Sequence, residues 1–209
     1  MAETAIETRD LSLWYGTFQA LFDVNIRVKQ GTITSLIGPS GCGKSTLLRT
    51  INRVNERLGY VRTTGAIDVM GEDIFAEGVE LARLRKEVGM VFQRPNPLPL
   101  SIRDTVLFSH RIHRRYEKVS RAEEDALVED ALREVLLWAD LKNLVSQRAT
   151  SLALEEQQKL CIARLRPTKP QLLLMDEVTT DLDVVSRQAL LQFLREECDA
   201  RGAPVVYST

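Results

Sequence analysis

One stretch, Gly38 to Thr46, constrains this chain more than any other. It reads Gly-Pro-Ser-Gly-Cys-Gly-Lys-Ser-Thr and matches the pattern G-x-x-x-x-G-K-[ST] of phosphate-binding loops. Glycine allows backbone turns that other residues avoid, so successive N–H groups of such a loop can point inward at one anion. The pattern predicts that these residues bind the phosphates of a nucleotide: Gly38, Pro39, Ser40, Gly41, Cys42, Gly43, Lys44, Ser45 and Thr46.

The surrounding residues predict that this loop joins a strand to a helix. The run 32–37 precedes it as a short buried strand, and Gly59 is placed to end the helix that follows. The loop would lie at the positive end of the helix dipole, where Lys44 reaches the β- and γ-phosphates and the Ser45 hydroxyl binds Mg²⁺. A glycine-rich turn with an accidental lysine is the alternative, and the context disfavours it. Apolar residues recur at helical spacing: Leu47, Leu48, Ile51, Val54 and Leu58.

Length and charge exclude several classes of protein. At 209 residues the chain can form one sizeable core or a core with a subdomain, and a net charge of −1 gives no reason to expect a nucleic acid partner. No apolar run approaches the roughly 18 residues of a membrane span, and residues 1–4 carry no signal peptide pattern. Cys42, Cys161 and Cys198 lack metal-ligand spacing, so we expect reduced thiols in a cytosolic protein.

Strand patterns on both sides of the loop predict a β-rich N-terminal part. Tyr15 closes the first strand, upstream of the loop, where its ring could stack on a purine or could instead cover the core. The expected strands are 11–15, 21–28, 65–71 and 88–92, with a charged helix at 81–87.

The chain becomes helical in character from 101 to about 166. Three prolines within 94–100 forbid a regular helix and mark the boundary. Ser120 with Glu123 forms a capping box, and a second helix is expected at 155–164. For the cluster 110–115, with two histidines and three arginines, a solvated basic face is expected in preference to a metal site. The apolar face behind the capping box consists of Leu127, Ala131, Leu132, Val135 and Leu136.

The apolar run 171–175 is followed directly by two carboxylates, Asp176 and Glu177. Such a run is the usual acidic partner of a phosphate-binding loop, so we expect Asp176 to bind Mg²⁺ through water and Glu177 to polarise the attacking water. The alternative is a pair of acidic residues that opens a loop. A helix at 184–200 and a buried strand from Pro204 complete the pattern.

These residues together resemble a known family, the ATP-binding subunits of ABC transporters, over essentially the whole chain. The resemblance implies that adenine stacks on Tyr15 and that Gln93 contacts Mg²⁺ and the attacking water. It also implies that Thr-Asp-Leu-Asp at 180–183 crosses a dimer interface. Within the family, residues 91–97, followed by Ser-Ile at 101–102, are most similar to the phosphate importers. The loop with its cysteine and the segment 160–164 are similar to that branch as well.

Two departures from the family stand out. Its signature Leu-Ser-Gly-Gly-Gln is replaced by Leu-Ala-Leu-Glu-Glu at 152–156. The serine hydroxyl and glycine N–H groups that grip the γ-phosphate of the other subunit are thereby lost, and a carboxylate at Glu155 pointing there would repel it. Closure of a homodimer is therefore expected to be weakened. The family's switch histidine would follow Thr209, so we expect an incomplete domain; Val178 and Asp181 are milder deviations, similar to soluble, non-transporter members.

We expect an α/β fold of the P-loop NTPase class, as the resemblance implies. It has a mostly parallel sheet core, an antiparallel N-terminal β portion and an inserted helical subdomain. One ABC ATPase domain would have its core in 1–93 and 166–209 and its helical subdomain in 94–165. The implied function is binding and hydrolysis of ATP with Mg²⁺ by the energy-coupling subunit of an importer, most similar to those for inorganic phosphate. Glu177 and Gln93 would be catalytic, and Ser45, Gln93 and Asp176 would hold the metal.

The implied partners are transmembrane permease subunits and a second ATPase subunit, in a homodimer or a heterodimer, at the cytoplasmic face of the cell membrane. Because the signature is degenerate, one alternative is a regulatory or soluble module that binds nucleotide with little or no hydrolysis. Another alternative keeps hydrolysis by pairing this chain with a subunit whose signature is intact.

Overall fold

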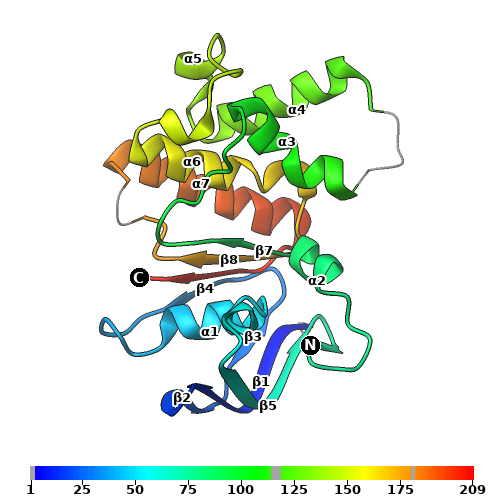
Figure 1. Ribbon diagram of the computed structural model, residues 1–209, viewed down its shortest axis with the longest axis vertical. Coiled ribbons are helices and arrows are strands. Elements are labelled where there is room, and N and C mark those ends of the chain that lie inside the picture. The colour runs from blue at the N-terminus through cyan, green and yellow to red at the C-terminus, as the bar shows by residue number, and fades with distance from the viewer. Residues whose placement is uncertain (1–2, 114–118, 180–181) are drawn as a thin grey trace. The chain divides into compact units, whose positions relative to one another are not determined.

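The computed structural model describes residues 3–113, 119–179 and 182–209, which form two compact units. The first unit contains the residues up to Met90 with Gln171–Glu177 and Glu196–Thr209, and the second contains Val91–Pro170 and Val178–Arg195. Along the chain (Figure 1), the elements are β1 (Thr4–Tyr15), β2 (Phe18–Val24), β3 (Arg27–Lys29), β4 (Ile33–Leu36), α1 (Lys44–Ile51), η1 (Asn55–Leu58), β5 (Val61–Val69), β6 (Glu72–Asp73), α2 (Leu81–Glu87), β7 (Val88–Val91), α3 (Ile102–His113), α4 (Arg121–Glu134), α5 (Trp138–Leu141), η2 (Ala149–Ser151), α6 (Leu154–Ala163), η3 (Arg166–Thr168), β8 (Leu172–Asp176), α7 (Val184–Arg201) and β9 (Val205–Ser208).

One sheet, with the strand order β4-β9-β8-β7, supports the phosphate-binding loop. β9 pairs in parallel with β4 on one side and with β8 on the other. Every residue of β8 is buried, as expected for a strand inside a parallel sheet. The carboxyl ends of parallel strands share one edge, so the loop after β4 and Asp176 at the end of β8 lie at the same edge.

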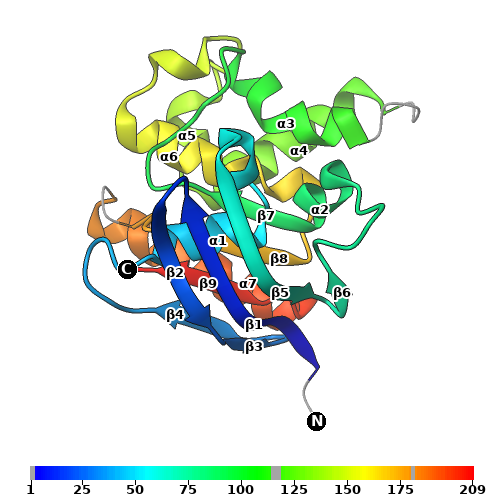
Figure 2. The same cartoon turned by 60° about the horizontal axis from the view of Figure 1, so that its bottom comes forward.

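The other sheet is antiparallel and has the order β2-β1-β5-β6, with β3 also paired to β1 (Figure 2). In its register Tyr15 lies opposite Phe18. The single strand predicted for 21–28 is wrong, because β2 and β3 are separate. Asp23 has a φ of +44°, and Asn25 Nδ2 donates to the Asp23 carbonyl over 2.9 Å, which turns the chain between them. The α/β class with a parallel sheet and antiparallel N-terminal strands is confirmed.

Helix α1 contacts β8 of the parallel sheet and β2 of the antiparallel sheet. The prediction that this helix continues to Gly59 was wrong, because α1 ends at Ile51 and Gly59 closes η1 instead. The break has a local cause. Asn52 Nδ2 donates to the Val88 carbonyl over 2.6 Å, and Arg53 takes a φ of +54°, which an α-helix does not allow.

The second unit contains α3 to α6 and the first part of α7. The capping box of Ser120 and Glu123 is confirmed at the start of α4. Leu136 does not belong to the buried face, because α4 ends before it and its side chain is 49% exposed. His110 is not on a solvated face either: it is 6% exposed, with Nδ1 3.4 Å from the Pro167 carbonyl oxygen. The His113 side chain and residues 114 and 115 lie outside the described part.

An ion-pair network joins α3 to α4 within the second unit. Glu124 accepts from Arg111 over 2.6 Å and from Arg103 over 2.9 Å. Arg111 also pairs with Asp104, and Arg103 also pairs with Asp125. The hydrogen bonds from Arg111, followed by those from Arg103, lower the pKa of Glu124 to about 2 although burial opposes them. The network therefore depends on an ionised Glu124.

Candidate functional site

The start of α1 is open to an anion. Gly43 is its N-cap residue with a φ of +100°, no side chain caps the first turn, and the first turn contains no acidic residue. A side chain at Gly43 would place Cβ 2.9 Å from Leu21 Cδ2 and 3.2 Å from the Ala20 carbonyl oxygen, so only glycine fits. The first N–H groups of α1 thus lack side-chain partners at the positive end of the helix dipole. These features fit the phosphates of a nucleotide.

Lys44 folds back over the loop that it follows. Its Nζ donates to the carbonyl oxygens of Gly38 over 2.8 Å and of Pro39 over 3.2 Å, and lies 3.7 Å from Glu177 Oε1. The side chain is 9% exposed. A buried ammonium needs such oxygen partners, and phosphate oxygens would be stronger partners than neutral carbonyls.

Asp176 is fully buried at the end of β8, where it collects three hydrogen bonds. Its carboxylate accepts from Ser45 Oγ over 2.6 Å, from Arg49 Nη2 over 3.0 Å and from Ser208 Oγ over 3.2 Å. The two predicted metal-binding residues of this unit, Ser45 and Asp176, are thus in direct contact. A hydroxyl and a carboxylate are the oxygen ligands that Mg²⁺ prefers.

Ser208 and Arg49 are functional candidates that the sequence reasoning missed. Ser208 lies at the end of β9, the neighbour of β8, and its Oγ also accepts from the Glu177 N–H over 3.0 Å. The position of Ser208 beside Asp176 follows only from the pairing of β8 with β9. Arg49 lies on the α1 helix one turn after Ser45, so helical spacing was an available signal.

A cavity of about 170 Å³ connects the loop to the antiparallel sheet within the first unit. Of the predicted residues it brings together Tyr15, Lys44, Ser45 and Glu177 with part of the loop. Phe18 was not predicted, although it is 68% exposed and faces this cavity. Pro39, Ser40 and Cys42 are exposed and do not line it. The lining residues are Tyr15, Phe18, Ala20, Gly41, Gly43, Lys44, Ser45, Thr46 and Glu177.

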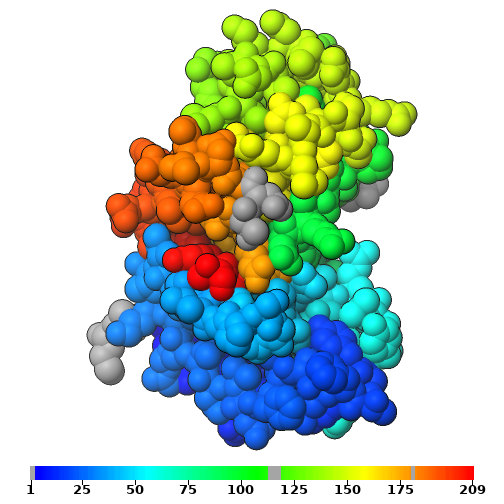
Figure 3. Space-filling model, turned by 90° about the vertical axis from the view of Figure 1, so that its left-hand side faces the viewer, coloured from blue at the N-terminus to red at the C-terminus, as the bar shows by residue number. Residues whose placement is uncertain are grey.

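The surface view shows the same edge of the first unit from outside (Figure 3). The red C-terminal strand β9 reaches the surface beside the light-blue segment that contains the loop and α1. The Thr209 N–H also donates to the Leu36 carbonyl over 3.3 Å, which ties the end of β9 to the residues that lead into the loop.

Gln93 and the segment 180–183 were the other predicted site residues. Gln93 follows β7, is exposed and belongs to the second unit. Thr180 and Asp181 lie outside the described residues. Asp183 directly precedes α7, and hydrogen bonds from Ser186 hold the pKa of Asp183 below its usual range. The functions predicted for these residues remain predictions.

The start of α6, where the family signature is replaced, differs from the start of α1. Glu156 Oε2 accepts from the Ala153 N–H over 2.8 Å, so the helix caps itself with a carboxylate. Glu155 Oε1 lies 2.9 Å from Lys159 Nζ and accepts from Ser186 Oγ over 3.0 Å. Both acidic side chains have partners inside their own unit. A capped, negatively charged first turn does not favour an anion.

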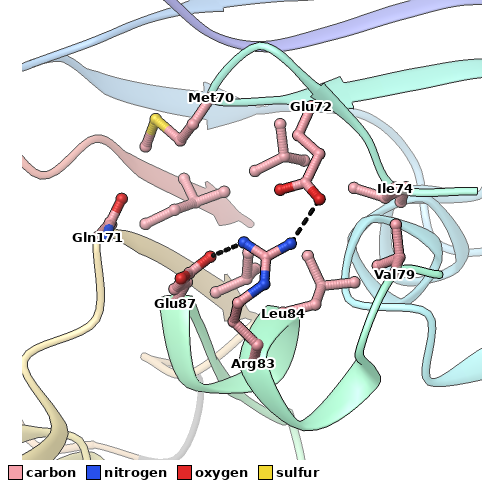
Figure 4. A pocket seen from close by; sticks show the side chains of 11 residues that line it. Met70, Glu72, Ile74, Val79, Arg83, Leu84, Glu87 and Gln171 are labelled. Atoms are coloured by element: carbon pink, nitrogen blue, oxygen red, sulfur yellow. Dashed lines mark hydrogen bonds and ion pairs between the residues drawn. The ribbon is translucent and has the colours of Figure 1, made fainter. Parts of the chain in front are cut away.

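A second cavity, of about 250 Å³, lies in the first unit between β5, β6, α2 and the start of β8 (Figure 4). Arg83 crosses it and pairs with Glu72 and with Glu87. Apolar side chains such as Met70, Ile74 and Leu84 surround these charges (Figure 4). Arg83 thus pairs with both carboxylates, and these three side chains carry a net charge of −1.

Among the described residues, no group of three or more His, Cys, Asp or Glu side chains could hold a metal ion, so Mg²⁺ at Ser45 and Asp176 would take its further ligands from water and nucleotide oxygens. In the same residues, no helix combines the length and the apolar character needed to cross a membrane.

Comparison with known proteins identifies a family that this chain matches. The family described as "ABC transporter" matches residues 21–180. The phosphate import ATP-binding protein PstB of Mycoplasma capricolum subsp. capricolum is 44% identical over 186 residues, which is 88% of this chain and 68% of that protein.

Solved structures share the fold of this chain. The ATP-binding cassette MJ0796, in a dimeric post-hydrolysis state bound to ADP and Pi, has a TM-score of 0.84 at 25% identity over 98% of this chain and 87% of that chain. Clostridium perfringens cbiO1, part of the ABC transporter complex cbiONQ, has a TM-score of 0.76 at 24% identity over 99% of this chain and 78% of that one. The loop and buried Asp176 lie within the matched range, and the chain belongs to the ABC transporter family of ATPases.

Proposed function

We propose that this chain binds ATP with Mg²⁺ at the Gly38–Thr46 loop and hydrolyses it as the energy-coupling subunit of an importer, with inorganic phosphate as the transported solute. One observation carries the enzymatic part: Lys44, Ser45, Asp176 and Glu177 converge on one edge of the parallel sheet. The solute is supported by the 44% identity to a phosphate import protein. In this reading the transported phosphate never touches the chain.

Each residue of the site would have a separate task. Lys44 would exchange its carbonyl partners for the β- and γ-phosphate oxygens, and the open first turn of α1 would donate N–H groups to the same anion. Mg²⁺, when bound, would neutralise charge that develops on the phosphates. Ser45 and Asp176 would hold that ion. Glu177, released from Lys44, would accept a proton from the attacking water.

The partners would be transmembrane permease subunits and a second ATPase subunit at the cytoplasmic face of the membrane. Gln93 would sense the permease and contact Mg²⁺ and water. The proposed domain arrangement is a core in 1–93 and 166–209 with a helical subdomain in 94–165.

The capped start of α6 favours a second candidate function. A first turn that carries Glu155 and Glu156 is poorly suited to contact the nucleotide of another subunit. The chain would then be a module that binds ATP with little hydrolysis, or one half of a heterodimer. In such a heterodimer, the partner's intact signature would complete the site at this chain's loop.

Phosphate release from the purified chain with ATP and Mg²⁺ tests the proposal, with Glu177→Gln as the matched control. We expect turnover in the wild type and none in the variant. Lys44→Ala should lower ATP affinity at least about a hundredfold, because it removes a charge-assisted contact and leaves the phosphates unpaired. Undiminished ATP binding by Lys44→Ala would reject the site. ATP binding without turnover in the wild type would favour the second candidate.

A further inference from the structure

We propose that Asn55 is a positioning residue for the nucleotide base, because it holds the Tyr15 ring in a fixed relation to the phosphate-binding loop. This inference rests on the proposed binding of ATP. Asn55 lies in η1, well after the loop motif, and is 4% exposed. It does not line the cavity and would act through Tyr15.

The hydrogen bonds of Asn55 fix its orientation. Its Nδ2 donates to the Thr46 carbonyl over 3.0 Å and to Thr50 Oγ1 over 2.9 Å. A backbone carbonyl can only accept, so the amide nitrogen must face Thr46 and the amide oxygen must face the other way. That oxygen, Oδ1, accepts from the Tyr15 hydroxyl over 3.0 Å. Both amide hydrogens and the amide oxygen therefore have partners.

This arrangement links the two ends of the nucleotide cavity. Thr46 is the last residue of the loop, Tyr15 is at the end of β1, and both line the same 170 Å³ cavity. Asn55 connects them through two hydrogen bonds. A base attached to phosphates at the loop would meet the Tyr15 ring at a set distance and in a set plane.

The orientation of the ring matters because stacking depends on the plane in which the ring lies. The Tyr15 ring meets Tyr60 edge to face, with ring centroids 6.4 Å apart, and its hydroxyl is held by Asn55. Phe18 lies opposite Tyr15 in the strand register and carries no hydroxyl to anchor it. Asn55 therefore makes Tyr15 the fixed ring of the pair.

A ligand without a base separates positioning from a merely structural contribution. Binding of ATP and of inorganic tripolyphosphate to the full chain is measured by calorimetry for the wild type, Tyr15→Phe and Asn55→Leu. Tyr15→Phe keeps the ring and removes only the hydroxyl. We expect each variant to bind ATP about fivefold more weakly, the size of one hydrogen bond, with tripolyphosphate affinity unchanged. The double variant should lose no more than either single variant.

Tyr60→Phe is the matched control, since it removes a neighbouring hydroxyl and keeps the edge contact, and it should bind both ligands like the wild type. Full ATP affinity in Tyr15→Phe would overturn the proposal, and so would an equal loss of both ligands in Asn55→Leu. If the wild type binds neither ligand, the proposed function itself fails. Tyr15→Phe leaves Asn55 intact, so the test stands even if Asn55→Leu does not fold.

Discussion

Glu177 has a backbone conformation that residues with side chains rarely adopt. Its φ is +48°, in the left-handed region, directly after the buried carboxylate of Asp176. Such a conformation costs about 1–3 kcal/mol and persists only where the surroundings impose it. Here the Ser208 hydroxyl binds the Glu177 N–H and the Asp176 carboxylate together. Ser208 therefore holds two acidic residues with one oxygen atom.

Replacement of Ser208 by alanine tests this role. We expect Ser208→Ala to lower the free energy of unfolding by about 1–2 kcal/mol, because the Glu177 N–H loses its acceptor. The gain in ATP affinity on adding Mg²⁺ should also shrink, since Asp176 is less firmly held. Urea denaturation and ATP titrations with and without Mg²⁺ measure both effects.

Ser146→Ala provides the comparison, because Ser146 is an exposed serine of the second unit. It should change neither quantity. If Ser208→Ala, like Ser146→Ala, left both the free energy of unfolding and the Mg²⁺-dependent gain in ATP affinity unchanged, the Ser208 hydroxyl would have no positioning role.

At the residue scale, motif positions were predictable and supporting positions were not. The glycines, Lys44 and Ser45 follow from a local pattern with fixed spacing. Asn55 and Ser208 come from segments whose own sequence shows no sign of function. Asn55 bonds to Tyr15, 40 residues away, and Ser208 bonds to Glu177, 31 residues away, and only the fold brings these pairs together.

The ion pairs between α3 and α4 make the stability of these two helices depend on the charge of Glu124. Glu124 has a pKa of about 2, well below the ordinary carboxyl value of 4.5. A lowered pKa in the folded state stabilises the protein above the unfolded value, and this stabilisation is lost as the pH falls from about 4.5 toward about 2. Glu124→Gln should therefore reduce stability by about 1 kcal/mol at pH 7, and the difference from wild type should vanish near pH 2 to 3.

Thermal unfolding followed by circular dichroism across this pH range measures the effect. Asp130→Asn, which changes an exposed carboxylate of the same helix, serves as the reference. A pH-independent difference between Glu124→Gln and the wild type would show that the ion pairs with Arg103 and Arg111 do not contribute.

Element types were more predictable than element ends. The helix at 81–87 was found from its charged, helix-favouring composition, and the start of α4 from its capping box. The break after Ile51 was missed, because the apolar spacing continues through it while the Asn52 side chain bonds to Val88. Such a contact between distant residues overrides a local period.

At the scale of the whole molecule, the starts of α1 and α6 have opposite character. α1 begins without a side-chain cap or an acidic residue in its first turn, whereas α6 begins with Glu155 and Glu156. The start of α1 is thus open to an anion, whereas the start of α6 offers no comparable anion site. In a homodimer, both copies would lack an anion site at the start of α6.

Restoring the start of α6 should therefore change assembly. In the Glu177→Gln background with ATP and Mg²⁺, we expect the chain to remain monomeric in sedimentation velocity. Adding Ala153→Ser, Leu154→Gly and Glu155→Gly should produce ATP-dependent dimers, because these changes expose first-turn N–H groups and remove one negative charge. Glu155→Gln alone, which removes only the charge, shows how much of the effect is electrostatic. ATP-dependent dimers of the unrestored chain would contradict the expectation.

The hairpin between β1 and β2 limits which sequence changes the protein tolerates. Surface turns usually accept insertions and deletions. Here only Gly16 and Thr17 separate Tyr15 from Phe18, and Gly16 has a φ of +58° with its N–H bound to the Tyr60 carbonyl. One inserted or deleted residue would shift the register and send one ring to the opposite face of the sheet. This exposed turn should therefore be among the least permissive sites for length variation.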